Sequence, residues 1–160
     1  MNNLDFFKAY FKNEFKATFD IIKAMPSDQL EYRPHPINRT AYEIAEHIAA
    51  HVYDFEVIIN NKQCDERLVY TFNSPSELAD NIKKMWEQAE ASLETLDAKQ
   101  WEEEPVELLI NGKSFVTLPR MHMMWFFYND IIHHRGQLSS YIRPMGGKNP
   151  AVYGYSADTI

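Results

Sequence analysis

Apolar residues recur every three or four positions in four long segments of the chain, a spacing that places them along one face of an α-helix. The first segment runs from Leu4 to about Ala24, with lysine, asparagine and glutamate between its apolar positions. Pro26 follows it directly, and the proline-rich stretch 32–36 comes soon after. Because proline disfavours helical backbone at and before its own position, we expect an extended connector there.

Two capping patterns predict where the next two helices begin. Thr-Ala-Tyr-Glu at 40–43 is a capping box, in which the threonine and glutamate side chains satisfy amides at a helix start. The second helix is therefore expected to extend from there to about Asn60. Ser-Pro-Ser-Glu at 74–77 has the same spacing, with proline at the first helical position, and predicts a third helix whose last apolar position is Leu96.

The connections and the end of the chain carry turn signals. The segment 61–73 is polar and is expected to be irregular, whereas Asn-Gly at 111–112 suits a tight hairpin between two short strands. Pro119 can start a fourth long helix. Proline and glycine within 143–147 end that helix, which leaves 148–160 as an irregular tail.

The fourth helix is apolar on nearly every face, which is typical of a helix at the centre of a bundle. Together these elements predict an all-α fold. It is a four-helix bundle with a long crossover, a small hairpin before the last helix and an irregular C-terminal tail. With 160 residues, 45% of them hydrophobic, the chain is expected to form one domain over 1–160.

Composition narrows the classes of partner. The net charge of −7 disfavours binding to a phosphate backbone or to an anionic membrane surface, so neither nucleic acid nor membrane is expected as a partner. No apolar run approaches the roughly 20 residues that span a bilayer. Cys64 is the single cysteine, expected to lie unreactive in a polar loop, and the first residues do not resemble a signal sequence. These features indicate a cytoplasmic protein.

Two of the predicted helices contain ionisable side chains that are costly to bury. Asp130 and His134 are four residues apart in an apolar, aromatic helix, and His47 and His51 have the same spacing in the second helix. Residues four apart share one helix face, and a bound divalent metal ion offsets the cost of burying such groups. Two imidazoles and a carboxylate are compatible with zinc, nickel, iron or manganese, with zinc or nickel favoured.

The chain resembles the DinB-like (DinB/YfiT-like) metalloenzyme family over most of its length. The resemblance lies in the stretches 30–34 and 40–48, and is sharpest in His-His-Arg-Gly-Gln-Leu at 133–138, with Tyr-Ile-Arg at 141–143 following. It implies a four-helix bundle that binds a divalent metal between helices, and frequent homodimers. It also implies enzymes that act on small molecules, some of them thiol-dependent S-transferases and others similar to amidohydrolases.

The resemblance also implies a ligand set. The family's usual three ligands are a histidine of the second helix, here His47, and a His-x-x-x-His pair of the fourth helix, whose last member is here His134. Asp130 stands at the remaining histidine position. Three arrangements stay open at this point: Asp130 binds the metal directly, Asp130 orients His134 or a water from outside the metal's own ligands, or His51 takes the third place.

Other residues near these positions have simpler explanations. Gln137 can line the pocket or make a hydrogen bond between helices, and Glu43 completes the capping box while standing one turn before His47. Gly136 is expected to permit close helix packing. Asp54 is expected to be solvated, and His133, about 100° around the helix from His134, is expected to be structural.

The leading functional hypothesis is a metal-dependent enzyme that activates water or a thiol for hydrolysis or group transfer on a small molecule, with a low-molecular-weight thiol as a candidate co-substrate. The alternative is a dimeric, non-catalytic bundle that binds a small molecule or a partner helix, with core histidines and no metal. A ferritin-like di-metal protein would need two Glu-x-x-His pairs, and only Asp130-x-x-His133 approximates one.

Overall fold

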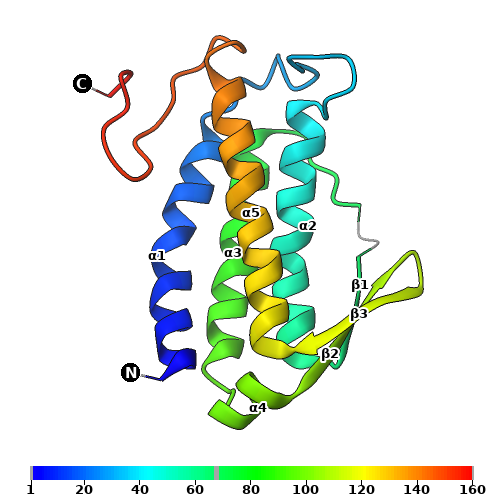
Figure 1. The fold of residues 1–160 in the computed structure, drawn as a ribbon. Coiled ribbons are helices and arrows are strands. Elements are labelled where there is room, and N and C mark those ends of the chain that lie inside the picture. The colour runs from blue at the N-terminus through cyan, green and yellow to red at the C-terminus, as the bar shows by residue number, and fades with distance from the viewer. Residues whose placement is uncertain (1, 67–68, 160) are drawn as a thin grey trace.

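The computed structural model describes residues 2–66 and 69–159, and its four long helices lie side by side in a bundle (Figure 1). They are α1 (Asn3–Lys23), α2 (Ala41–Asn60), α3 (Pro75–Leu93) and α5 (Arg120–Ile142). The shorter elements are helix α4 (Ala98–Glu103) and strands β1 (Gln63–Asp65), β2 (Pro105–Ile110) and β3 (Lys113–Pro119). The predicted bundle and hairpin are therefore confirmed. Met1, Arg67, Leu68 and Ile160, which belong to the predicted domain, polar segment and tail, lie outside the described residues.

The helices begin largely where the capping patterns predicted. The Thr40 hydroxyl accepts from the Glu43 amide at 3.1 Å, and the Glu43 carboxylate accepts from the Thr40 amide at 2.7 Å, which completes the capping box of α2. At α3 the Ser74 hydroxyl accepts from the Glu77 amide, but the Glu77 carboxylate accepts from the amide of Asn73 instead of Ser74. The second capping box is thus incomplete, because its return bond falls one residue earlier.

The small sheet contains a strand that the sequence did not predict. Asn111 (φ 52°) and Gly112 (φ 72°) both adopt left-handed backbone, as a two-residue type I′ hairpin requires, and they join β2 to β3. β1 lies inside the segment 61–73, which was expected to be irregular. It pairs in parallel with β2, with Cys64 opposite Leu108. Cys64 is therefore buried on a strand, and not in a polar loop. Burial, followed by the Asp54 carboxylate, raises the pKa of its thiol far above the ordinary value.

Aromatic rings fill the centre of the bundle. Phe11 of α1 stacks on Trp86 of α3 at 4.4 Å between ring centroids and meets Phe55 of α2 edge-on at 5.0 Å. Through such contacts α1 packs on α3, α3 on α2, and α2 on α5. The interface between α2 and α5 therefore lies across the bundle from the interface between α1 and α3.

No helix of the described residues is both long and apolar enough to cross a membrane.

A buried ion pair joins α1, α5 and the C-terminal tail. Arg135 Nη1 lies 2.8 Å from Glu14 Oε2, and both side chains are almost fully buried. The Tyr153 hydroxyl donates to the same Glu14 oxygen at 2.6 Å and accepts a hydrogen bond from Arg135, which also donates to Thr18. Apart from such contacts the tail is irregular, as predicted. The arginine of the His-His-Arg-Gly motif therefore links α5 to α1 and to the C-terminal tail.

Gly136 does not have the packing role expected of it. The residue is exposed on α5, and a methyl group placed on its Cα would meet no atom of a described residue within 4 Å. The expectation of close helix packing was wrong, because this position faces away from the neighbouring helices.

Replacing Gly136 with alanine is expected to increase the free energy of unfolding by about 0.5–1 kcal/mol, since alanine loses less backbone entropy in a helix. Urea denaturation of both proteins measures the change. Gly147→Ala is the matched control, because its new methyl group would lie 2.9 Å from Ile142 Cγ2 and 3.0 Å from the Ala24 carbonyl, and it is expected to destabilise. A loss of stability in Gly136→Ala would show that the position is packed after all.

Arg135→Met is expected to lower the free energy of unfolding by about 3–5 kcal/mol, because it leaves the Glu14 carboxylate buried without its cation. The double variant Arg135→Met/Glu14→Leu replaces both charges with apolar groups and is expected to recover much of that loss. Denaturation of the two single variants and the double variant gives the coupling energy directly. Additive effects would contradict the pairing.

Candidate metal centre

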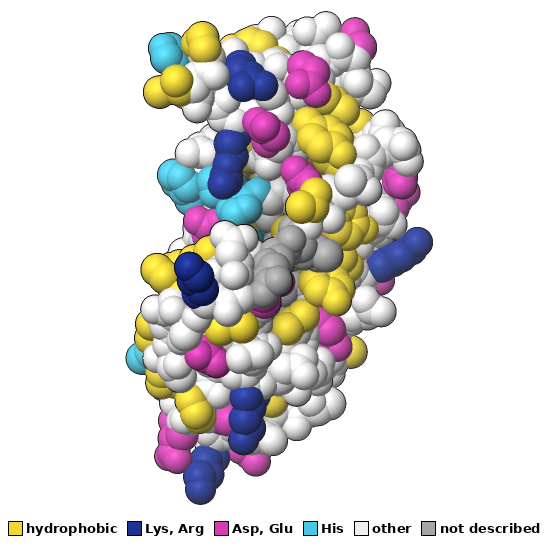
Figure 2. Space-filling view, turned by 90° about the vertical axis from the view of Figure 1, so that its right-hand side faces the viewer, with side chains coloured by type: hydrophobic (Ala, Val, Ile, Leu, Met, Phe, Trp, Pro, Cys, Tyr) yellow, Lys and Arg dark blue, Asp and Glu magenta, His cyan; other side chains and the backbone are white. Residues whose placement is uncertain are grey.

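Two helices deliver the four predicted polar residues to one place. His47 and His51 lie one turn apart on α2, Asp130 and His134 lie one turn apart on α5, and the two helices pack together. Figure 2, which views the molecule from the side of α2 in Figure 1, shows histidine side chains gathered on one face. The spacing of four within each helix therefore produces a cluster between helices, as the sequence predicted.

One carboxylate oxygen lies at the centre of this cluster. Asp130 Oδ2 is 3.1 Å from His47 Nε2, 3.0 Å from His51 Nε2 and 3.3 Å from His134 Nε2. Two ligand atoms that each lie about 2.1 Å from one metal ion are about 3.0 Å apart at a right angle and about 3.4 Å apart at the tetrahedral angle. The three separations from Asp130 Oδ2 match both direct hydrogen bonds from the imidazoles and the distances between neighbouring ligands of one ion.

Acceptors outside the cluster orient two of the rings. His134 Nδ1 lies 2.8 Å from the Gln137 side-chain oxygen, and His51 Nδ1 lies 3.3 Å from Asp54 Oδ2. These acceptors turn each Nδ1 outward and each Nε2 toward Asp130, the orientation that metal-binding histidines usually have. Gln137 thus bonds within its own helix. Asp54 is 3% exposed, so the expectation that it is solvated was wrong.

Glu66, which the sequence analysis missed, also reaches the cluster. Its Oε1 lies 3.9 Å from His51 Nε2, and His47, His51 and Glu66 offer three ligand atoms within 4.8 Å of one another. His47, Asp130 and His134 form a second such group. Glu66 follows β1 in a polar segment without helical spacing, so no local pattern pointed to it. The two groups share His47 and differ in their other members.

The charges of the cluster stabilise one another. Burial would raise the pKa of Asp130, but hydrogen bonds from His134, His47 and His51 outweigh it and hold that pKa well below the usual range. Burial would lower the pKa of His51, but hydrogen bonds to Asp130 and Asp54 and their charges raise it to about 9. Burial lowers the pKa of His47 despite its bond to Asp130. Asp130 is therefore an anion, the charge state of a metal ligand.

Two further candidates lie beside the cluster. His133 is exposed on α5, with its Nε2 2.9 Å from Gln137 Nε2, and it belongs to neither group of candidate ligands. Glu43 forms the capping box with Thr40 and lines a cavity next to His47. The Glu43 carboxylate accepts a hydrogen bond from the Thr40 backbone, and this bond is the main reason why the pKa of Glu43 is lowered.

Two cavities are each lined by one histidine of the cluster. We call the first the His47 cavity; its volume is about 260 Å³, and it is lined by Arg39, Glu43, Glu46, His47, Ala50 and Val69. We call the second the His134 cavity; its volume is about 450 Å³, and it is lined by Pro34, Asn38, Arg39, Ile44, His134, Gln137, Ser140 and Tyr141. Both volumes are of the size that accepts a small molecule or part of one.

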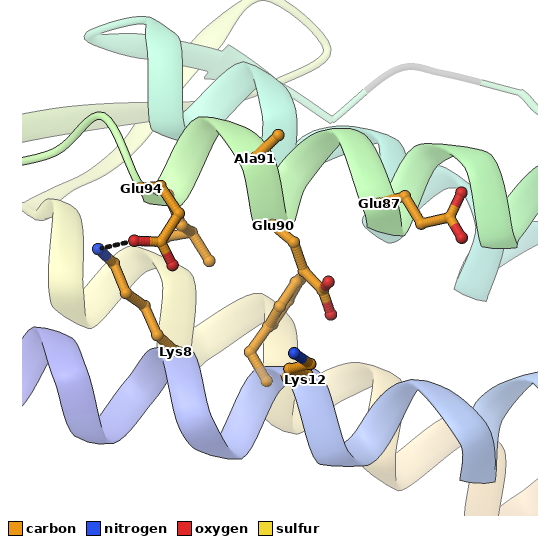
Figure 3. Close-up of a pocket in the computed structure, with 8 residues that line it drawn as sticks. Lys8, Lys12, Glu87, Glu90, Ala91 and Glu94 are labelled. Carbon is orange, nitrogen blue, oxygen red and sulfur yellow. Dashed lines mark hydrogen bonds and ion pairs between the residues drawn. The ribbon is translucent and has the colours of Figure 1, made fainter.

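A third hollow lies elsewhere and lacks this chemistry. It is a groove between α1 and α3 with charged walls, where Lys8 pairs with Glu94 at 2.9 Å and Glu87 and Glu90 lie on the facing helix (Figure 3). No histidine lines it. The candidate metal centre therefore belongs to the α2–α5 side of the molecule.

Comparison with solved structures supports the fold. A DinB-like protein from Bacillus subtilis is 20% identical with a TM-score of 0.71, and the match covers 97% of this chain and 100% of that one. A DinB-like protein from Bacillus cereus is 18% identical with a TM-score of 0.69, covering 92% of this chain and 95% of that one. No curated protein matches the sequence.

The sequence itself matches a family over almost its entire length. The model of the DinB family aligns with residues 1–159, which include both histidine-bearing helices and the tail that anchors Arg135. The resemblance found in the motifs at 40–48 and 133–138 is therefore confirmed. This chain belongs to the DinB family.

Proposed function

We propose that the protein is a metal-dependent enzyme in which His47, Asp130 and His134 hold a divalent ion. The observation that carries this proposal is the position of Asp130 Oδ2 within 3.3 Å of three imidazole nitrogens. The Asp130 carboxylate is half-buried among imidazoles and has lost part of its hydration, and a shared cation compensates all of these groups at once. Of the arrangements that the sequence left open, direct ligation by Asp130 fits these distances best.

The donor set suits the metal ions named from the sequence. Two imidazole nitrogens and one carboxylate oxygen are ligands of zinc and nickel, and also of iron and manganese. The distance of 3.0 Å between His51 Nε2 and Asp130 Oδ2 supports a role for His51 as a fourth donor or as a partner of the Asp130 carboxylate. A divalent ion held by three side chains supplies Lewis-acid activation of a water or thiol and polarises a substrate oxygen.

The protein's own residues prepare the site for hydrolysis or thiol-dependent group transfer on a small molecule. Gln137 and Asp54 hold His134 and His51 in the orientation that points each Nε2 inward. The Phe127 ring, 4.6 Å from that of His51, forms an apolar wall. Glu66 Oε1 lies close enough to the cluster to accept the proton that a water or thiol releases. The two cavities give a small substrate access to the cluster.

The alternative is a non-catalytic dimeric bundle whose histidines are core polar groups. It predicts that zinc does not change the midpoint of thermal unfolding, whereas a metal that binds the native state raises that midpoint by mass action. We expect zinc to raise it in the wild type and to leave His47→Ala unchanged. Differential scanning calorimetry with zinc and with a chelator measures both. An unchanged midpoint in the wild type would favour the alternative, and the homodimer itself stays a prediction.

His134→Ala is expected to weaken zinc binding by at least about 100-fold, because it removes a nitrogen that faces the ion. His133→Ala is the matched control: it removes the adjacent imidazole, which is exposed and belongs to neither ligand group, and is expected to weaken zinc binding far less. Competition with a chromophoric chelator measures both affinities. Equal affinities in His134→Ala and the wild type would defeat the assignment.

The residues that the two ligand groups do not share allow the groups to be distinguished. Under our proposal Glu66→Gln keeps zinc, whereas His134→Ala loses it. Loss of zinc from Glu66→Gln together with retention in His134→Ala would instead assign the metal to His47, His51 and Glu66. Metal analysis of the purified variants distinguishes these outcomes without any knowledge of the substrate.

Gln137→Leu is expected to reduce zinc affinity by about 10–100-fold, because the acceptor that orients His134 is lost. Gln137→Glu keeps an oxygen at the same place and is expected to retain most of the affinity. The pair is compared by isothermal titration with zinc. If both variants bind zinc like the wild type, Gln137 does not position His134.

A further inference from the structure

Arg39 lies where the two cavities beside the metal centre meet. It belongs to the connector before α2 and lines both the His47 cavity and the His134 cavity. Its backbone is fixed, because the Arg39 carbonyl accepts a hydrogen bond from the Tyr141 hydroxyl at 3.3 Å. Its exposed guanidinium makes no hydrogen bond or ion pair with the residues that the structure describes. An arginine with an anchored backbone and available guanidinium donors beside a candidate site can bind an anion.

The charges around the two cavities decide which one admits an anion. Glu43 and Glu46 line the His47 cavity together with Arg39, and their carboxylates repel a negative group there. No aspartate or glutamate is among the described residues that line the His134 cavity. The Arg39 charge also acts on Glu43 and Glu46, where it is one of the causes that act to lower the pKa of each carboxyl group. In the His134 cavity an anionic ligand would meet the same arginine without a competing carboxylate from the lining residues.

The other polar groups of the His134 cavity already have partners. Asn38 Nδ2 donates to the Tyr141 hydroxyl at 3.4 Å, and the Ser140 hydroxyl donates to the Gln137 carbonyl at 2.6 Å. The Gln137 side chain bonds to His134. Among the described residues, the cationic donors left for a ligand in this cavity come from Arg39.

From this arrangement we infer that the substrate is a small molecule carrying a carboxylate, which Arg39 binds while the reacting group lies beside His134. The inference rests on the proposed metal-dependent function. Guanidinium and carboxylate match as a planar pair with two parallel hydrogen bonds. The volume of about 450 Å³ accepts such a molecule. Because the chain carries a net charge of −7, an anionic substrate needs a local cation to overcome the general repulsion.

The test compares ligands that bind a metal through one end and differ at the other. Butyrohydroxamic acid has a neutral tail, whereas the monohydroxamates of succinic and glutaric acid carry a carboxylate on a short chain. On the zinc-loaded protein, we expect at least one carboxylate-bearing hydroxamate to bind about 10-fold more tightly than the neutral one. Arg39→Gln is expected to abolish this preference while the protein still binds zinc and butyrohydroxamic acid. Isothermal titration measures all of these affinities.

Arg33→Gln is the matched control. Arg33 lies on the same connector and loses the same charge, but it lines neither cavity, so the preference for the carboxylate is expected to remain. The inference is overturned if the wild type binds all three hydroxamates equally, or if Arg33→Gln and Arg39→Gln reduce the preference equally. If zinc does not bind, or no hydroxamate binds the zinc-loaded protein, the proposed function fails first and the inference fails with it.

Discussion

The Asp130 carboxylate, held against three imidazole nitrogens between α2 and α5, is the interaction on which the rest of the site depends. Removing a carboxylate from water costs several kcal/mol unless new partners replace the lost hydration. Here the partners come from two helices, each contributing two residues one turn apart. Rotating either helix by one residue would turn its pair by about 100° and dissolve the cluster. The relative register of α2 and α5 is therefore a condition for any chemistry at this place.

Several features of the fold maintain that register. The Thr40 capping box fixes where α2 starts. The stacked rings around Phe11 tie α1 to α2 and α3, and the ion pair of Glu14 with Arg135 ties α1 to α5. Arg135 directly follows His134, so adjacent residues of one motif serve the core and the candidate centre. A loss of stability and a loss of metal affinity can thus arise from neighbouring positions for different physical reasons.

How much of this was predictable depends on the range of the interactions. The four long helices and the α2–α5 cluster follow from repeats of three and four residues, and the hairpin from the Asn-Gly pair at 111–112, all of which are local patterns. The short helix α4 was not predicted. β1 and Glu66 were missed because their partners lie far along the chain and a three-residue strand carries no period. Asp54 and Gly136 were misjudged because the sequence gives the face of a helix only approximately. The role inferred for Arg39 could not be predicted from the sequence, because it depends on the position of this residue in the lining of both cavities.

A crystal structure of the zinc-loaded protein, with anomalous diffraction recorded on both sides of the zinc absorption edge, tests the central claim most directly. We predict one anomalous peak between α2 and α5, about 2.0–2.2 Å from His47 Nε2, His134 Nε2 and a carboxylate oxygen of Asp130. A peak bound by His47, His51 and Glu66 without Asp130, or no peak in this interface at full zinc loading, would contradict the assignment.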